Sequence, residues 1–498
     1  MSKLIIAHDL GTSGNKASVY NLRGELVAAS TRAYDTHYFN GNWAEQNPAD
    51  WWDAVSRSTR DVLEKVSPKD IAAVAFSGHM DGCLAVDGSG DPLHPHILWA
   101  DQRAEEEAAL IASQVEPATL FKDTGHMAAA TAILAKILWL KKHKPDVYAK
   151  THTFLSSKDY LVFKMTGQMF TEPSDASATL LFDINEGQWS SELASHFGVD
   201  MAKLPTVIES SAVAGTVTKD AARDTGLLVG TPVVMGGGDG CAASLGSGCV
   251  GADDVHISMG TSAWIMQTTD RPTNLVEDGT FTYCHVVPGM YSVTGTMQAA
   301  GSSYSWFSDI IGLDRERRQA LEREMLMIDP GANGLMFLPY LMGERSPYWD
   351  PKLKGAFFGL KRETSKAEMM RAVLEGVAMH MAVIQEKLDP HSSQIRKLNA
   401  VGGGARSDLW CQILADVLQV PIHRLSRLEE AGGLGVAVLA GVGTELFSDF
   451  NVIHDFQTVE KTFEPNHEAA SFYDSRLPLF KGAYELTRDL QAKLADGM

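Results

Sequence analysis

The 498-residue sequence lacks several features that would place it in a common class of protein. Basic residues are too few for a nucleic-acid-binding surface, because 43 lysines and arginines face 62 aspartates and glutamates, for a formal net charge of −19. The five cysteines have no CxxC or His-rich spacing, which excludes a disulfide framework and a zinc cluster. We expect these cysteines to be buried as small hydrophobic side chains.

Long apolar segments are also missing. No run approaches the ~18 apolar residues of a membrane span, and the N-terminal apolar stretch reaches His8 and Asp9 too soon for a signal peptide. We therefore expect a soluble, cytoplasmic protein without a nucleic-acid or membrane partner. The chain is too long for one hydrophobic core, and no Pro-, Ser- or Gly-rich linker divides it, so we expect several domains packed on each other.

Short apolar runs alternate with helical patterns, which is typical of an α/β fold. Residues 71–76 and 233–235 are predicted to be buried strands. Asn47-Pro48 predicts the start of a helix, with Asn as the N-cap and Pro in the first turn. Residues 133–142 predict another helix, whose C-terminal lysines are favoured by the helix dipole.

One pattern occurs twice. A strand-like segment leads into Gly11-Thr12-Ser13, and another leads into Gly260-Thr261-Ser262, half a chain later. Each is followed by a second strand-like segment. The repetition predicts two related halves, each opening with a hairpin whose turn is rich in N–H and hydroxyl donors.

Such turns suit a phosphate group, because glycine allows close approach and successive N–H groups hold an anion. The alternative is an ordinary hairpin turn. Asp9 before the first turn and Lys16 after it favour the phosphate interpretation. Asp9 is also a candidate anchor for Mg²⁺, through water, since Mg²⁺ keeps much of its hydration shell.

Two glycine strings follow predicted strands. Gly236–Gly238 precede Asp239, which is placed either to touch a substrate at the carboxyl end of a strand or to cap the next helix. Gly402–Gly404 could form a surface for a flat base or a tight strand-to-helix turn. Neither string completes GxGxxG, because Cys241 and Ser407 occupy the last positions, and no P-loop motif exists. A dinucleotide oxidoreductase is therefore disfavoured.

Two further clusters place polar groups beside a single aromatic, as a polyhydroxylated ligand requires. Taken singly, Trp99 could instead belong to the core, and Asp101 and Arg103 could form a structural ion pair. The candidate contacts are His79, Met80, Asp81, Trp99, Asp101 and Arg103.

The segment from Gly355 to Glu375 resembles the C-terminal signature of the FGGY family of carbohydrate kinases at every position. The family's other signature, around Lys136, is only partly kept. Within the family the sequence is most similar to the xylulose kinases. Further segments resemble the family from end to end: residues 9–13, 42–48, 158–161, 166–167, 239, 260–262, 338–347 and 402–407.

This resemblance implies an α/β fold of two duplicated actin/hexokinase/Hsp70-like (ribonuclease H-like) domains around a central cleft. Residues 1–245 would carry the sugar-binding side, the first phosphate loop and the catalytic Asp, and residues 246–498 the second phosphate loop and the adenosine side. The implied reaction is phosphorylation of a primary hydroxyl of a small sugar by ATP with Mg²⁺. The expected substrate is a pentulose such as xylulose, with another ketose or a polyol as the alternative, and a homodimer is the implied assembly.

The resemblance also implies residue roles. Asp239 corresponds to the catalytic base, and Asp9 and Asp239 would hold Mg²⁺ through water. The implied sugar contacts are His79, Met80, Asp81, Trp99, Asp101, Arg103 and Asp239. The implied ATP and phosphate contacts are Gly11, Thr12, Ser13, Lys16, Gly260, Thr261, Ser262, Gly403, Gly404, Ala405 and Ser407.

Two positions depart from the xylulose kinase pattern. Asp81 stands where those enzymes have a His, which exchanges a hydrogen-bond donor for an obligate acceptor, and Gly240 stands where Asn or Gln commonly follows the base. A different class of function, an actin-like ATP-binding scaffold or sensor, would keep both turns and the glycine string without a polar sugar pocket. The acidic and basic candidates Asp81, Arg103 and Asp239 favour the kinase.

Overall fold

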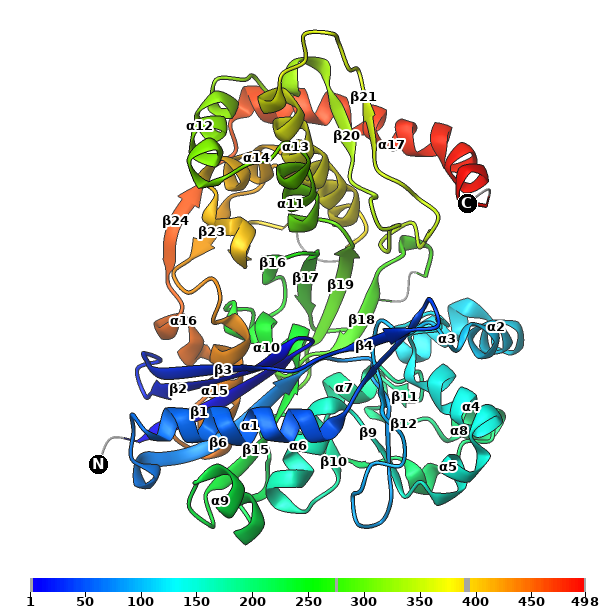
Figure 1. Cartoon of the computed structure of the whole chain (residues 1–498), viewed down its shortest axis with the longest axis vertical. Coiled ribbons are helices and arrows are strands. Elements are labelled where there is room, and N and C mark those ends of the chain that lie inside the picture. The colour runs from blue at the N-terminus through cyan, green and yellow to red at the C-terminus, as the bar shows by residue number, and fades with distance from the viewer. Residues whose placement is uncertain (1–2, 274–275, 389–394, 497–498) are drawn as a thin grey trace.

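The computed structural model describes residues 3–273, 276–388 and 395–496, and two open sheets form its framework, one from each half of the chain (Figure 1). The N-terminal sheet has the strand order β14-β15-β6-β1-β2-β3. Its strands are β1 (Leu4–Gly11), β2 (Gly14–Asn21), β3 (Leu26–Ala33), β6 (Ile71–Gly78), β14 (Val213–Thr216) and β15 (Pro232–Gly238).

The C-terminal sheet has the order β18-β19-β17-β16-β22-β23-β24. Its strands are β16 (Val255–Met259), β17 (Ala263–Thr269), β18 (Phe281–Cys284), β19 (Tyr291–Met297), β22 (Leu398–Val401), β23 (Ile422–Leu425) and β24 (Val459–Phe463). A separate hairpin, β20 (Met336–Leu338) with β21 (Ala356–Phe358), lies beyond this sheet at the upper end of Figure 1.

The two sheets repeat one topology. In the first, β1, β2 and β3 form an antiparallel meander, and β6 and β15 add parallel strands on the other side of β1. In the second, β16, β17 and β19 form the meander, and β22 and β23 add the parallel strands. The predicted α/β fold of two duplicated domains is therefore confirmed, whereas the boundary at residue 245 stays a prediction.

Helices cover both sheets. Those of the N-terminal half are α1 (Pro48–Leu63), α2 (Glu105–Gln114), α3 (Pro117–Thr124), α4 (Ile133–His143), α5 (Pro145–Lys150), α6 (Ser157–Thr166), α7 (Pro173–Ser177), α8 (Ser191–Phe197), α9 (Lys219–Thr225) and α10 (Asp239–Gly246). Those of the C-terminal half are α11 (Gly301–Ile310), α12 (Arg315–Leu326), α13 (Lys366–Gln385), α14 (Asp408–Leu418), α15 (Ala431–Gly443), α16 (Ile453–Phe456) and α17 (His467–Asp496).

The local signals in the sequence act as expected. The Asn47 side chain accepts the N–H of Ala49 and caps α1, and Pro48 occupies the first turn. Trp51, Val55 and Val62 of this helix are fully buried against the N-terminal sheet. Helix α4 begins at Ile133 as predicted and ends one residue later than predicted. All five cysteines are buried. Among the described residues, no helix is long and apolar enough to cross a bilayer.

One helix joins the halves. Although α15 comes late in the sequence, it packs on β1, β6 and β15 of the N-terminal sheet and against α10. The two helices touch at backbone distance, since a Cβ on Gly246 would lie 1.7 Å from the carbonyl oxygen of Ala431, and one on Gly435 would lie 1.9 Å from that of Ala242. Only glycine allows this approach.

Candidate active site

The first Gly-Thr-Ser turn is a tight connection between β1 and β2, with Gly11 opposite Gly14 in the ladder. Side chains from neighbouring segments hold its carbonyls: Gln46 Nε2 donates to the oxygen of Thr12 at 2.7 Å, and the Tyr34 hydroxyl donates to that of Gly11. Trp99 Nε1 donates to Thr12 Oγ1 at 3.1 Å. Trp99 therefore lies beside the first turn and not in the core, with 36% of its surface exposed, and its role as a sugar contact stays a prediction.

The second turn and the glycine string line one cavity. Its volume is about 560 Å³, within the range of small-molecule sites. Gly260 and Thr261 form one side of it, and Gly403, Gly404 and Ser407 another. The fold thus brings together two motifs that the sequence separates widely, and the aromatic residues Tyr304 and Trp410 complete the wall.

The glycine string packs directly on the strand that carries the second turn. Gly402 has a φ of 87°, and a Cβ there would lie 2.7 Å from the carbonyl oxygen of Met259. A Cβ on Gly404 would lie 2.9 Å from Met259 Cβ, whereas one on Gly403 would meet open space. The string is therefore both a tight strand-to-helix turn and an open backbone surface.

Two predicted nucleotide contacts have side chains that are occupied elsewhere. Ala405 is fully buried and does not line the cavity. Ser407 is the N-cap of α14, and its Oγ accepts the N–H of Trp410 at 3.2 Å. Ser407 still lines the cavity, but with a side chain that the helix already uses.

Asp239 is the first residue of α10, directly after the end of β15, and it is half-buried. Its Oδ1 accepts the N–H of Gly240 at 2.8 Å, so the carboxylate also serves the helix terminus. Burial, followed by the charge of Asp9, raises the pKa of Asp239 to about 8. Asp9 is held by Ser77, whose Oγ donates to Asp9 Oδ1 at 2.7 Å. Two carboxylates thus repel each other across the space beyond β1 and β15.

Lys16 lies beside Asp9 in the ladder but extends to the other half of the chain. Its Nζ donates to the carbonyl oxygen of Glu429 at 3.3 Å. The Glu429 side chain pairs in turn with Arg406 at 2.5 Å. Arg406 lines the cavity of about 560 Å³ at the second turn, called below the nucleotide-sized cavity. A polar chain therefore links the strand after the first turn to the cavity of the second.

Met80 and Asp81 lie next to Asp239. The Met80 thioether packs on Gly238, where an added Cβ would lie 2.5 Å from its sulfur. The charge of Asp81 contributes to the raised pKa of Asp239, and burial raises the pKa of Asp81 itself. Met80 thus packs on the residue before the proposed base, and Asp81 lies within range of its charge.

Asp81 has a left-handed backbone, with a φ of 58°. A non-glycine residue keeps such a conformation only where its surroundings impose it, and these positions cluster at functional sites. Lys136 Nζ donates to the carbonyl oxygen of Asp81 at 2.5 Å and to that of Leu98 at 2.9 Å. From the C-terminal half, the Tyr283 hydroxyl donates to Asp81 Oδ2 at 3.4 Å. Lys136 therefore anchors this loop, although the sequence offered only a partly kept signature around it.

Three candidate sugar contacts lie behind the site. His79 is 2% exposed, its ring packs on Trp51 with centroids 5.5 Å apart, and burial lowers its pKa to about 3. Asp101 and Arg103 form a fully buried ion pair at 2.7 Å, and the guanidinium carbon lies 4.0 Å from the ring centroid of Trp43. The structural ion pair, the alternative for these two residues, is the arrangement that the geometry favours. All three side chains are enclosed by protein.

A buried charge cluster was missed at the sequence level. Lys158 Nζ contacts the carboxylates of Asp159 at 2.7 Å, Asp175 at 2.9 Å and Glu172 at 3.3 Å, and all four side chains are buried. Burial opposes the charge of Lys158, but the three carboxylates outweigh it and raise the pKa of the lysine. A charged pair at 158–159 inside an apolar stretch is the sequence signal that could have found it.

This cluster supports the strand that presents Asp239. Ser174 Oγ donates to Glu172 Oε1 at 2.6 Å and accepts the N–H of Gly238 at 2.9 Å. Gly238 immediately precedes Asp239 in the chain. The position of the carboxylate is therefore fixed by a hydrogen-bond chain that runs from the buried lysine cluster to the end of β15.

Comparison with known proteins assigns the family. Residues 4–246 match the N-terminal domain of the FGGY family of carbohydrate kinases, and residues 255–444 match its C-terminal domain. The chain is 32% identical over 449 residues to xylulose kinase from Staphylococcus xylosus, covering 90% of this chain and 92% of that protein. It is 30% identical to xylulose kinase from Escherichia coli K12, covering 98% and 100%.

A solved structure agrees with this assignment. The crystal structure of ligand-bound xylulose kinase from Lactobacillus acidophilus superimposes with a TM-score of 0.93 at 26% identity, covering 99% of this chain and 100% of that one. Family and fold thus agree with the expectation from the sequence. The chain belongs to the FGGY family of carbohydrate kinases and is an ATP-dependent sugar kinase.

Proposed function

We propose that this kinase transfers the γ-phosphoryl group of ATP to a primary hydroxyl of a pentulose, and that xylulose is the first substrate to test. The observation that carries the proposal is Asp239, a half-buried carboxylate at the end of β15, close enough to Asp9 and Asp81 for their charges to add to the effect of burial on its pKa. The names of the relatives, xylulose kinases over nearly the whole chain, support the substrate class.

In this proposal the nucleotide base lies in the cavity of about 560 Å³ against Gly403 and Gly404, and the phosphates meet the two Gly-Thr-Ser turns. Local donors are required, because the net charge of −19 repels an anion. Phosphoryl transfer passes through a loose transition state, so positioning and charge stabilisation supply most of the catalysis.

Asp239 orients the sugar hydroxyl and accepts its proton late, when the bond to phosphorus has made the oxygen acidic. An ordinary Asp, with a pKa of about 3.9, is a weak base for an alcohol. Burial is the first cause of the raised pKa of about 8, and it persists when a cation offsets the charge of Asp9, so the ionised carboxylate is a stronger base than an ordinary Asp. The Ser174–Gly238 hydrogen bond keeps the carboxylate at the strand end while the substrate binds.

Mg²⁺ fits this set of residues. The mutual repulsion that raises the pKa of Asp239 through Asp9 is the kind that a divalent cation removes, and carboxylate oxygens are its preferred protein ligands. We propose that Asp9 and Asp239 hold the ion through water. When bound, Mg²⁺ neutralises charge on the transferring phosphoryl group.

The sugar lies, in the proposal, between Trp99 and the Met80-Asp81 pair. Trp99 offers a half-exposed ring beside the first turn, and Asp81 can only accept hydrogen bonds from hydroxyls when it is ionised. Because Asp81 replaces a His of the xylulose kinases, another ketose or a polyol is the alternative substrate.

The test is ADP release measured with a panel of ketoses and polyols. We expect one ketopentose to have the highest kcat/KM and Asp239→Asn to lose at least about a hundredfold in kcat, as expected when general-base catalysis is removed. Asp220→Asn, a change of an exposed carboxylate on α9, is the matched control and should behave as the wild type. Undiminished turnover of Asp239→Asn would contradict the assigned role, and ATP binding without sugar-stimulated turnover would contradict the reaction.

We also propose that the kinase is a homodimer. The C-terminal helix α17 exposes a row of leucines, Leu486, Leu490 and Leu494, with exposed fractions of 86%, 57% and 59%. Their spacing of four residues puts them on one helical face, the pattern of a helix–helix interface. Light scattering should give twice the monomer mass for the wild type and a monomer for Leu486→Glu combined with Leu490→Glu. A monomeric wild type would contradict the proposal.

A further inference from the structure

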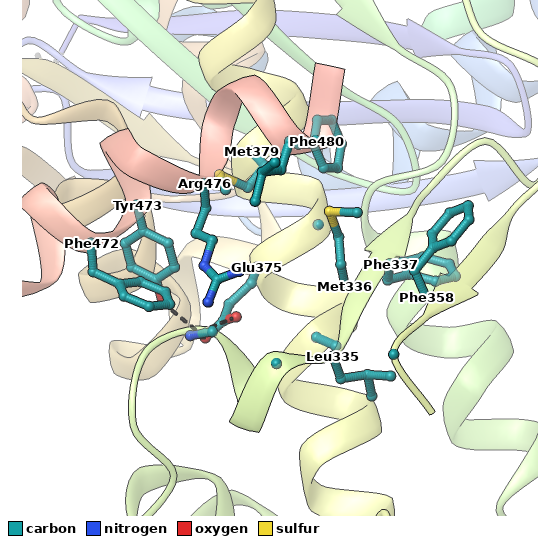
Figure 2. Close-up of a pocket in the computed structure, with 16 residues that line it drawn as sticks. Leu335, Met336, Phe337, Phe358, Glu375, Met379, Phe472, Tyr473, Arg476 and Phe480 are labelled. Atoms are coloured by element: carbon teal, nitrogen blue, oxygen red, sulfur yellow. Dashed lines mark hydrogen bonds between the residues drawn. The ribbon is translucent and has the colours of Figure 1, made fainter. Parts of the chain in front are cut away.

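A second cavity lies in the C-terminal half, away from the nucleotide-sized one. It has a volume of about 150 Å³ and lies between α13, α17 and the β20–β21 hairpin (Figure 2). None of its lining residues lines the cavity of the second turn, and none belongs to the predicted site.

Most of the second cavity is apolar. A dry cavity of about 150 Å³ lined by aliphatic and aromatic side chains is known to bind benzene, so its size suits a single ring or a branched chain of similar volume. The side chains that form its apolar wall in Figure 2 are Leu335, Met336, Phe337, Phe358, Met379 and Phe480.

The one carboxylate of the cavity is already satisfied. Glu375 Oε1 accepts from Arg371 Nε at 2.8 Å and from the Tyr473 hydroxyl at 2.8 Å, and the N–H of Gly331 lies 3.1 Å from both of its oxygens. Because Arg371 balances the charge of Glu375, this group does not call for a cationic ligand.

Arg476 differs from Glu375 in having no charge partner among the residues that the structure describes. It extends from α17 toward Glu375 in Figure 2, and its guanidinium carbon lies 5.0 Å from the ring centroid of Phe472. Across the described part of the chain, no carboxylate lies within the 4.0 Å of an ion pair with it. An apolar cavity with one unpaired guanidinium at its rim is complementary to a small molecule with an anionic end.

We propose that this cavity binds a small monocarboxylate whose body is one ring or a branched hydrocarbon of that size. The body fills the apolar wall, and the carboxylate forms charge-assisted hydrogen bonds with Arg476, whose planar fork matches it. The site is separate from the reaction centre, so it would receive a molecule other than the sugar or the nucleotide.

The second cavity adjoins the nucleotide-sized one through helix α13. Ala372, Glu375 and Met379 face the second cavity, while Leu374, on the opposite side of the same helix, lines the first. Arg371 connects them, since its Nε donates to Glu375 and its Nη1 donates at 3.0 Å to the carbonyl oxygen of Met325, a residue that lines the cavity of about 560 Å³. We therefore expect occupancy of one cavity to change affinity at the other, reciprocally.

The probe for binding is 4-fluorobenzoate, followed by ¹⁹F NMR on the intact kinase. We expect saturable binding at one site that persists when ADP is saturating. Arg476→Gln should weaken it at least about tenfold, because it removes the charge-assisted hydrogen bonds of the guanidinium. Arg488→Gln, a change of another exposed arginine on α17 that lies outside the cavity, is the matched control and should bind as the wild type.

A neutral analogue separates charge recognition from apolar filling. 4-Fluorobenzamide should bind equally to the wild type and to Arg476→Gln. No saturation with 4-fluorobenzoate up to about 10 mM, displacement of the probe by ADP, or an affinity that Arg476→Gln leaves unchanged would each overturn the proposed site. For the link between the cavities, the Kd of ADP should change several-fold when the probe is saturating. An unchanged Kd would overturn that link.

Discussion

Replacing Asp239 by Asn should make the protein more stable while it slows the reaction at least about a hundredfold. The ordinary pKa of Asp is 3.8, and in the folded chain burial and the charge of Asp9 raise it to about 8. Below pH 3.8 Asp239 is protonated in both the folded and the unfolded state, so its carboxyl does not destabilise the fold. Between pH 3.8 and about 8 Asp239 is ionised only in the unfolded state, and the free energy by which it destabilises the folded state grows with pH. Above that range this free-energy penalty is constant.

The magnitude follows from this interval. At pH 7 the penalty is about 1.36 kcal/mol for each pH unit above 3.8, or about 4 kcal/mol, and solvent access to the half-buried carboxylate reduces it to about 2 kcal/mol. At pH 5 the same reasoning gives less than about 1 kcal/mol. Asn keeps an oxygen for the N–H of Gly240 and carries no charge, so it removes the penalty without losing that hydrogen bond.

The assay is thermal unfolding without nucleotide at several pH values. For a unit of the size of the N-terminal half, 2 kcal/mol corresponds to a rise in Tm of about 4 °C at pH 7, with a smaller rise at pH 5. The exposed Asp220→Asn change is the control and should show no such pH-dependent difference. Equal Tm values for wild type and Asp239→Asn across this range would refute the raised pKa of Asp239. They would also remove the reason to regard this carboxylate as a stronger base than an ordinary Asp.

Four further substitutions, two of them a matched pair, test other parts of the site. Gly403→Val should raise the KM for ATP about tenfold with an unchanged Tm, because the new side chain enters the open cavity. Gly404→Val should instead lower the Tm, because its side chain meets Met259. Equal effects of the two substitutions would contradict the different surroundings of these two glycines. Lys158→Met should destabilise the protein by about 3–5 kcal/mol in chemical denaturation, since it leaves three buried carboxylates without their cation; a neutral effect would show that the cluster is not ionised. Ser77→Ala should increase the Mg²⁺ concentration needed for half-maximal activity, with kcat at saturating Mg²⁺ nearly retained, because Asp9 loses its fixed orientation; an unchanged Mg²⁺ dependence would remove Asp9 from the metal site.

The parts of the fold that depend on local chemistry could be predicted from the sequence. The Asn47-Pro48 start of α1, the strand that ends before Asp239 and the two Gly-Thr-Ser hairpins all follow from residues adjacent in the chain. Their half-chain repetition also predicted the duplicated topology, because equal hairpins begin each sheet. Predictions of this kind need no knowledge of tertiary contacts.

The roles of His79, Asp101 and Arg103 could not be separated from those of Met80 and Asp81 by pattern alone. His79 is buried because Trp51, from a helix earlier in the chain, covers its ring. Asp101 is occupied because the N–H of Ala44 donates to it at 2.6 Å. In each case a segment distant in sequence decides whether a polar side chain faces a ligand or the protein.

The packing of helix α15 on the N-terminal half bears on how the protein would respond to cleavage. Exposed residues such as Ala252 and Asp253 lie in the connection from α10 to β16. A protease that cut there would break the covalent chain but would not release either fragment. Helix α15 would still cover β1, β6 and β15 of the N-terminal fragment, and its backbone would still pack closely on that of α10. A nicked molecule should therefore migrate as one particle until it is denatured, and the N-terminal fragment produced alone would expose the apolar surface that α15 normally covers.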